Sequence, residues 1–144
     1  MQPTKRFTGV IAVTVASLAL TVGTAQATPS RGVTATIISK ETSSTAEIVR
    51  AEITIQPGGS TGWHYHDGQV SGTVKEGTLS HFNSTCASDG TYHAGDRITE
   101  DSGPGYVHIG QNRGTTPVVL DVTYINPIGK PLSEDVPNPG CSFQ

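Results

Sequence analysis

The sequence predicts an all-β fold, either a small antiparallel β-barrel or a double-sheet jelly roll. Two segments, residues 47–55 and 117–125, alternate between apolar and polar side chains, as strands with one buried face do. Clusters of glycine and proline separate short segments of this kind, and no stretch keeps an apolar period of 3.6 residues. Because helices of a globular domain show that longer period, a helical or α/β domain is not expected.

Short strands with turn signals between them account for most of the chain. In chain order, the expected strands are residues 33–39, 47–55, 63–66, 70–75, 78–82, 97–99, 106–109 and 117–125. Pro57-Gly58-Gly59 breaks the second of them, and Gly77 supplies the positive φ of a tight turn. Residues 84–92 are expected to form a polar loop, and the chain from Asn126 onward an irregular tail.

The alternating segments also predict the core. The side chains expected on their buried faces are Val49, Ala51, Ile53, Ile55, Val118, Leu120, Val122 and Tyr124. Trp63 and Tyr65 are expected to face away from the histidines with which they alternate. Asn112 is expected to fix a turn by hydrogen bonding to the backbone. His81 and His93 are interpreted as surface or structural residues.

The start of the chain has the order of a secretory signal peptide. Two basic residues precede a mostly apolar run, residues 7–22, and Ala25-Gln26-Ala27 then offers small residues for cleavage. The run is short for a membrane span of roughly 20 residues, so cleavage is favoured over a membrane anchor. We therefore expect a signal peptide at residues 1–27, a single domain at residues 28–144, and a secreted protein.

Charge and size exclude several kinds of partner and chemistry. Without Lys5 and Arg6, seven basic residues remain against twelve acidic ones, which gives a net charge of −5. The basic residues are scattered, so nucleic-acid binding is not expected. The mature chain is long enough for one hydrophobic core but not for two. The serine residues lack the strand–turn–helix context of a catalytic nucleophile.

The two cysteines, Cys86 and Cys141, are expected to form a disulfide. Export and an even number of cysteines favour oxidation, and the bond would tie a mid-chain loop to the tail. Two free thiols are the alternative. Zinc binding through these residues is not expected, because neither cysteine lies in a Cys-x-x-Cys pair.

Two histidines lie one residue apart in the segment GGSTGWHYHDGQ, residues 58–69. Because alternate side chains of a strand share a face, His64 and His66 should project side by side, with Cα atoms roughly 6.5–7 Å apart. Two such imidazoles can ligate one transition metal, although two polar residues on a wet strand face are the simpler alternative. A metal site needs a third ligand from elsewhere, and His108 is the candidate.

The stretches around these histidines resemble the two motifs of the cupin superfamily. The residues similar to the first motif, G-x5-H-x-H-x3-4-E-x6-G, are Gly58, His64-Tyr65-His66 and Lys75-Glu76-Gly77. The residues similar to the second, G-x5-P-x-G-x2-H-x3-N, are Gly95-Asp96, Gly105-Tyr106-Val107-His108 and Asn112. The resemblance spans about residues 47–126. The chain looks like the small, exported, single-domain cupins of actinobacteria.

This resemblance implies a cupin barrel in which His64, His66 and His108 hold a divalent transition metal. It does not distinguish iron, manganese, zinc, nickel and copper. It also implies a small organic ligand or substrate in the barrel, oxidoreductase or isomerase chemistry if the protein is an enzyme, and a homodimer, since cupins often form one. The alternatives are a non-catalytic cupin that binds a small ligand or a sugar, and a structural protein with a vestigial site.

The first motif departs from the family pattern at its carboxylate ligand. The glutamate position holds Val70, preceded by Gln69. Three replacements are left open: the carbonyl oxygen of Gln69, a carboxylate of Glu100 or Asp101, or three histidines whose open positions take water or substrate. Glu100 and Asp101 are expected to be solvated turn residues. Glu100 is also the one nearby carboxylate that we nominate as a general base.

Overall fold

The computed structural model describes residues 26–144, and within that range it contains strands but no helix. The strands are β1 (Arg31–Thr42), β2 (Glu47–Ser60), β3 (His64–Tyr65), β4 (Gln69–Glu76), β5 (Thr78–Asn83), β6 (Ser88–His93), β7 (Arg97–Glu100), β8 (His108–Gln111), β9 (Val118–Asn126) and β10 (Glu134–Asp135). Nearly all of the expected signal peptide lies outside the described residues. In the described part, no helix is long and apolar enough to cross a membrane.

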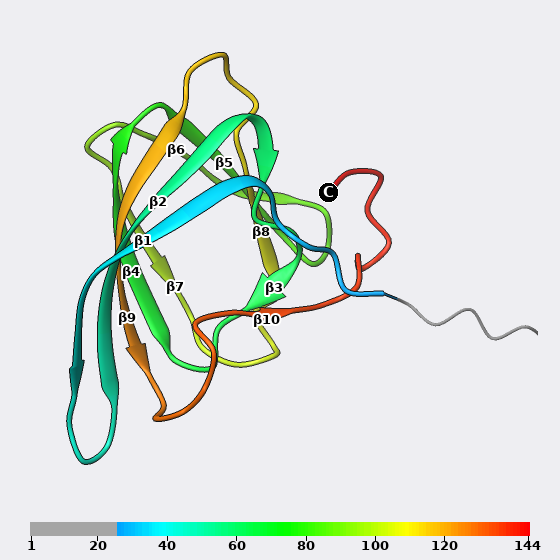
Figure 1. Ribbon diagram of the computed structural model, residues 1–144. Helices are drawn as coiled ribbons and strands as arrows, with labels where there is room; N and C mark the ends of the chain where they lie inside the picture. Colours follow the sequence, from blue (N-terminus) through cyan, green and yellow to red (C-terminus); the bar gives the residue numbers. More distant parts are fainter. Residues whose placement is uncertain (1–25) are drawn as a thin grey trace, which may run out of the picture.

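The strands form one antiparallel sheet that curls into a nearly closed barrel (Figure 1). Hydrogen bonds connect them in the order β10-β3-β8-β2-β9-β4-β7, while β1 pairs with β2, and β5 pairs with both β8 and β6. The predicted all-β barrel or jelly roll is therefore confirmed. In this arrangement β3 and β8, which carry the candidate metal ligands, lie next to each other.

The long strand β2 takes part in both sides of the barrel because it bends at Pro57-Gly58-Gly59. Its first part pairs with β9, and its last residue, Ser60, pairs with β8. Gly58 has a φ of +75°, and a Cβ at Gly59 would lie 2.8 Å from the carbonyl oxygen of Arg31. The sequence predicted a strand end at this point. Glycine permits a sharp bend inside a continuous strand instead.

Two apolar clusters fill the interior. The larger one consists of Ile55, Val70, Val74, Leu79, Ile98, Val118, Leu120 and Val122. The smaller one consists of Trp63, Phe82 and Ile109, and the tail residue Phe143 packs against it, 5.9 Å from Trp63 between ring centroids. The predicted inward faces of β2 and β9 are buried or half-buried. Trp63 thus packs on the side of its strand opposite the flanking histidines.

The structure forms the predicted disulfide between Cys86 and Cys141, whose Cα atoms are 5.5 Å apart. Cys86 lies in the turn between β5 and β6, and Cys141 packs against the smaller apolar cluster. The bond therefore fixes the C-terminal tail to the barrel wall that carries β3, β5 and β8. In Figure 1 the tail runs past β3 on its way to the C-terminus.

Two segments that were predicted to be irregular contain strands. Residues 84–92 include most of β6, which pairs with β5, so the prediction of a loop was wrong. The β6 sequence Ser-Asp-Gly-Thr-Tyr-His has no apolar alternation, and only its pairing partner defines it as a strand. The tail contains β10, which pairs with β3.

Asn112 fixes the loop between β8 and β9, as the sequence predicted. Its side-chain amide donates to the carbonyl oxygens of Ile55 and Thr116 and accepts from the backbone of Gly114, and the residue is 1% exposed. Asn112→Ala is expected to lower the free energy of unfolding by about 3 kcal/mol, because it leaves buried backbone groups without partners. Urea denaturation measures this loss. Asn138→Ala, which removes similar contacts from the exposed tail, should cost less.

Candidate metal centre and cavity

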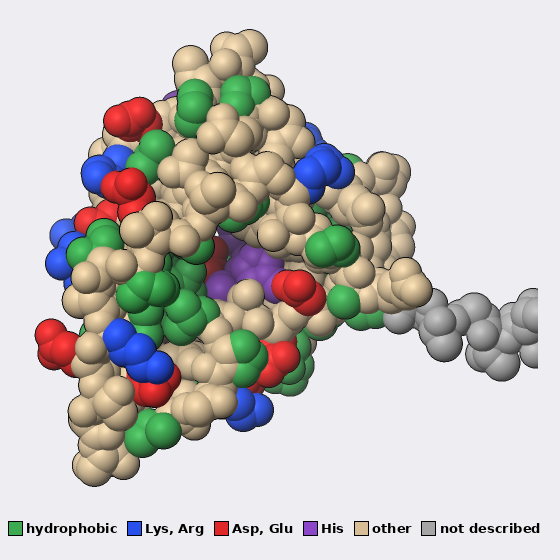
Figure 2. Space-filling view, viewed as in Figure 1, with side chains coloured by type: hydrophobic (Ala, Val, Ile, Leu, Met, Phe, Trp, Pro, Cys, Tyr) green, Lys and Arg blue, Asp and Glu red, His purple; other side chains and the backbone are tan. Residues whose placement is uncertain are grey.

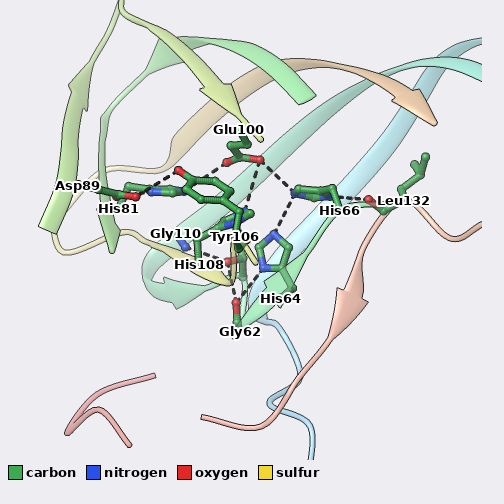
Figure 3. Close-up of polar contacts among 11 residues, drawn as sticks. Gly62, His64, His66, His81, Asp89, Glu100, Tyr106, His108, Gly110 and Leu132 are labelled. Atoms are coloured by element: carbon green, nitrogen blue, oxygen red, sulfur yellow. Dashed lines mark hydrogen bonds and ion pairs between the residues drawn. The ribbon is translucent and has the colours of Figure 1, made fainter. Parts of the chain in front are cut away.

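Strand pairing brings the three predicted histidines together. His64 and His66 share one face of the chain at β3, and β3 pairs with β8 so that His64 lies directly opposite His108. The ring centroids are 4.4 Å apart for His64 and His108, 4.8 Å for His64 and His66, and 5.2 Å for His66 and His108. The three residues are 7%, 4% and 0% exposed, respectively. Figure 3 shows the rings converging on one point.

Backbone carbonyl groups orient all three rings. The Nδ1 atoms lie 2.9 Å from the oxygen of Gly62 for His64, 2.6 Å from that of Leu132 for His66, and 2.9 Å from that of Tyr106 for His108. A carbonyl oxygen only accepts, so each Nδ1 carries the proton and the Nε2 of a neutral ring keeps a free lone pair. This pattern is typical of histidines that bind a metal through Nε2.

The Nε2 atoms face one another without the protons that would satisfy them. Those of His64 and His66 are 3.2 Å apart, and that of His108 is buried with no hydrogen-bond partner among residues 26–144. Burial, and then the neighbouring His108 and His66, lower the pKa of His64 to about 3, so its ring is neutral at ordinary pH. A cation between these atoms would satisfy lone pairs that converge in this way.

Glu100 supplies a carboxylate to the same point. Its Oε2 lies 3.0 Å from Nε2 of His66 and 3.4 Å from Nε2 of His108. Burial alone would raise the pKa of this carboxyl group, but the neighbouring rings of His108, His66 and His81 hold the pKa well below its usual range. The carboxylate is therefore ionised and can serve as an anionic ligand.

Glu100 compensates for the carboxylate that the first motif lacks. In the β4–β7 ladder, Val70 pairs with Glu100, and residues opposite each other in a ladder project to the same side of the sheet. The carboxylate thus reaches the site from the neighbouring strand, at the level of the position that Val70 occupies. The expectation of a solvated turn residue was wrong for Glu100, whose side chain is 14% exposed. The alternation of Glu100 with buried Ile98 could have indicated this.

The other proposed replacements do not reach the site. Gln69 is exposed, because alternation along β4 places it on the face opposite buried Val70. Asp101 is exposed after the end of β7. The weak assignment of Gln69 as a ligand is therefore corrected in favour of Glu100.

His81 was expected at the surface or in a structural role, but it is 1% exposed and lies beside the site. Its Nδ1 contacts Oδ1 of Asp89 at 2.5 Å, and its Nε2 contacts Oε1 of Glu100 at 3.3 Å. Burial would lower the pKa of His81, but Glu100 and Asp89 raise it above the usual value. His81 thus holds Oε1 of Glu100 and leaves Oε2 turned toward the other histidines. His93, in contrast, is exposed.

The four converging atoms fit a divalent transition metal. Ligand atoms about 2.1 Å from a common ion lie roughly 3.0 Å apart in octahedral geometry and roughly 3.4 Å apart in tetrahedral geometry. The separations of 3.2, 3.0 and 3.4 Å described above fall in this range. Imidazole nitrogen with a carboxylate oxygen suits iron, manganese, zinc, nickel and copper. The orphaned Nε2 of His108 is the group that such an ion would satisfy.

A cavity of about 310 Å³ opens beside these residues. His64, His66, Glu100 and His108 form part of its wall, and strands β1, β2, β4 and β9 supply most of the remainder. Figure 2 shows histidine side chains at the bottom of this hollow, with apolar side chains along one side of its opening and an acidic side chain on the other. A volume of this size is at the lower end of those that hold small organic ligands.

Acidification is expected to destabilise the metal-free protein through His64. Its folded-state pKa of about 3 lies below the ordinary 6.5, so between these values the unfolded chain binds a proton that the folded chain does not. The contribution of His64 is therefore present above pH 6.5 and is lost as the pH falls. Urea titrations with a chelator at pH 7.5 and 5 should show a smaller loss for His64→Gln than for the wild type.

Folding raises the pKa of His81, so His81 changes the stability with pH in the direction opposite to His64. The readout is therefore the difference between the stability losses of the wild type and His64→Gln. His93→Gln, at an exposed position, should keep the wild-type pH dependence. Parallel losses for the wild type and His64→Gln would contradict the assignment of a neutral, buried ring to His64.

Comparison with known proteins gives a likeness in fold. No family model and no curated protein sequence matches the chain. The polyketide cyclase RemF from Streptomyces resistomycificus is 18% identical, with a TM-score of 0.61 over 77% of this chain and 75% of that one. A Klebsiella pneumoniae protein with a double-stranded β-helix domain is 21% identical, with a TM-score of 0.57 over 72% of this chain and 84% of that one. A recombinant oxalate oxidase in complex with glycolate is 18% identical, with a TM-score of 0.52 over 66% of this chain and 51% of that one.

The fold is therefore the double-stranded β-helix of the cupins, which the sequence motifs predicted. Within that fold, the three histidines form a group with the spacing of metal ligands. The likeness to exported cupins of actinobacteria stays a prediction.

Proposed function

We propose that this protein is an exported cupin that binds one divalent transition metal through His64, His66, His108 and Glu100, and a small organic ligand in the adjacent cavity. The observation that carries the proposal is the convergence of three histidine Nε2 atoms and one carboxylate oxygen, with each histidine Nδ1 held by a carbonyl. Metal binding accounts for three histidine lone pairs that face one another in a buried site. Export rests on the signal-like start of the sequence.

A bound ion would supply Lewis acidity and, if it is iron, manganese or copper, redox chemistry. The residues of the chain would fix the position of a ligand relative to that ion. Glu100 would lower the net charge of the centre from +2 to +1, and the barrel wall would keep bulk water away from the bound ligand. These roles suit an oxidoreductase or an isomerase that acts on a small oxygen-bearing molecule.

A non-catalytic cupin that holds the same kind of ligand is the second candidate. Glu100 was the nominated general base, but its contacts with His66 and His108 assign its carboxylate to the metal centre. Of the described residues lining the cavity, Asp135 is the other carboxylate, and it belongs to the exposed strand β10. The scarcity of a free base next to the centre favours binding without proton transfer.

Elemental analysis of the purified secreted protein tests the proposal. One equivalent of a transition metal, lost in Glu100→Ala and kept in Glu76→Ala on the exposed end of β4, is the expected result. A metal-free protein that takes up no iron, manganese, zinc, nickel or copper on titration would contradict it. If the metal is bound, turnover of a ligand by the metal-loaded protein would indicate an enzyme, and binding without turnover would indicate a binding protein.

A further inference from the structure

We propose that the cavity takes a monoanionic ligand with an apolar, ring-sized body, which presents its anionic oxygen to the metal centre. This inference rests on the proposed function and specifies its ligand. It excludes small dianions, phosphates and sugars as the preferred ligands. The reasons are the apolar wall, the absence of lysine and arginine from its described lining, and the charge of the centre.

Much of the cavity wall consists of aliphatic side chains. Val33, Ile53, Val70, Leu120 and Val122 come from four different strands and all line the cavity. A ligand that contacts them gains free energy in proportion to the apolar surface it removes from water. A sugar would instead lose hydrogen bonds between water and its hydroxyl groups, with few partners on this wall to replace them.

Lysine and arginine side chains are missing from the described lining of the cavity. None of its lining residues in the described part of the chain is lysine or arginine, and none is asparagine or glutamine. A carboxylate or phosphate at a distance from the ion would therefore be buried without a charged or amide partner, which is strongly unfavourable. The ligand can place a negative charge only where it touches the metal centre.

The charges around the centre fix how many negative charges the ligand carries. As ligands of a divalent ion, three imidazoles and one carboxylate would give the centre a net charge of +1. His81 and Asp89 contact each other beside the centre as a pair. One anionic oxygen neutralises the centre, and a second would leave an excess negative charge in an apolar cavity.

Two small residues leave room for the body of the ligand. Ala51 is fully buried on β2, and Ala35 lies at the exposed rim on β1, yet both line the cavity. Phenylalanine at either position would extend into the space that the ligand body needs. Because neither residue takes part in the hydrogen bonds or ion pairs of the histidines and Glu100, this substitution should leave the metal centre intact.

A pair of probes that differ only in an apolar body tests the inference. Glycolate and mandelate carry the same α-hydroxycarboxylate, so both can chelate the ion in the same way, and mandelate adds a phenyl ring. Isothermal titration calorimetry of the zinc-loaded protein should give at least roughly tenfold tighter binding for mandelate, with a more negative heat-capacity change. Ala35→Phe should weaken mandelate binding at least roughly tenfold and leave zinc stoichiometry and glycolate binding unchanged.

The outcomes separate this inference from the proposed function. Failure of zinc to bind would overturn both. Stoichiometric zinc with glycolate binding as tightly as mandelate, or with mandelate binding untouched by Ala35→Phe, would overturn the inference and leave the metal centre standing. Ala51→Phe is the second variant, for use if Ala35→Phe alters the fold as judged by circular dichroism.

Discussion

His108→Gln is expected to abolish stoichiometric metal binding and to lower the affinity for zinc by roughly 100-fold or more. His108 is fully buried, its Nε2 lies 3.4 Å from Oε2 of Glu100, and its ring is centred 4.4 Å from that of His64. Losing a metal ligand should cost more than losing the partner of a ligand, which typically costs 10–100-fold. Competition of zinc against a chromophoric chelator measures the affinity.

His93→Gln is the matched control for this variant, because it makes the same substitution at an exposed residue of β6. It should bind zinc as the wild type does. The metal-free His108→Gln protein should still fold, since glutamine has a similar length and its amide can donate to the Glu100 carboxylate that lies beside His108. A folded His108→Gln protein with wild-type zinc affinity would disprove the proposed centre.

Removing the disulfide is expected to lower the free energy of unfolding by about 4 kcal/mol. The bond between Cys86 and Cys141 closes a loop with a sequence separation of 55, and the chain-entropy relation gives about this value for such a loop. The double variant Cys86→Ser and Cys141→Ser, compared with the wild type in urea, measures the loss. Ser142→Ala changes the exposed neighbour of Cys141 and should leave stability unchanged.

The same double variant should also weaken metal binding by roughly tenfold. The tail fixed by the bond is continuous with Leu132, whose carbonyl oxygen accepts from Nδ1 of His66 at 2.6 Å. A looser tail would release this partner, and partners of metal-binding histidines typically affect affinity 10–100-fold. Phe143→Ala, which loosens the tail but keeps the disulfide, should have a smaller effect in the same direction. Unchanged affinity in the double variant would show that the tail does not position His66.

Local patterns were sufficient for the strands whose two faces differ. In β2 and β9 the alternation of apolar and polar residues reflects a more buried and a more exposed side, and the fully buried apolar residues of both strands all lie on the predicted inner face. The segment that became β6 gave no such signal, because its edge position leaves most of its side chains in water. The bend in β2 was recognised as a break, but a break and a bend have the same glycine signature.

The candidate site likewise contains residues that the sequence predicted and residues that it did not. Its histidine pair followed from a spacing of two along a strand, and His108 followed from a family resemblance. Glu100 was misjudged, and the structural role expected for His81 was not placed at the site. Alternation with Ile98 indicates which side of its strand Glu100 faces, but not which residues it meets there. The positions of Glu100 and His81 depend on the pairing of β4 with β7 and of β5 with β8.

By itself, the sequence determined the class of fold, the pair His64 and His66, and the cysteines available for a disulfide. These depend on side-chain periodicity and on residue identity, both of which are local properties of the chain. The tertiary structure alone decided that Glu100 takes the place of the missing carboxylate, that His81 holds it, and that the carbonyl group of Leu132 orients His66. Those contacts join segments far apart in the chain, and their geometry is fixed only when strand register closes the barrel.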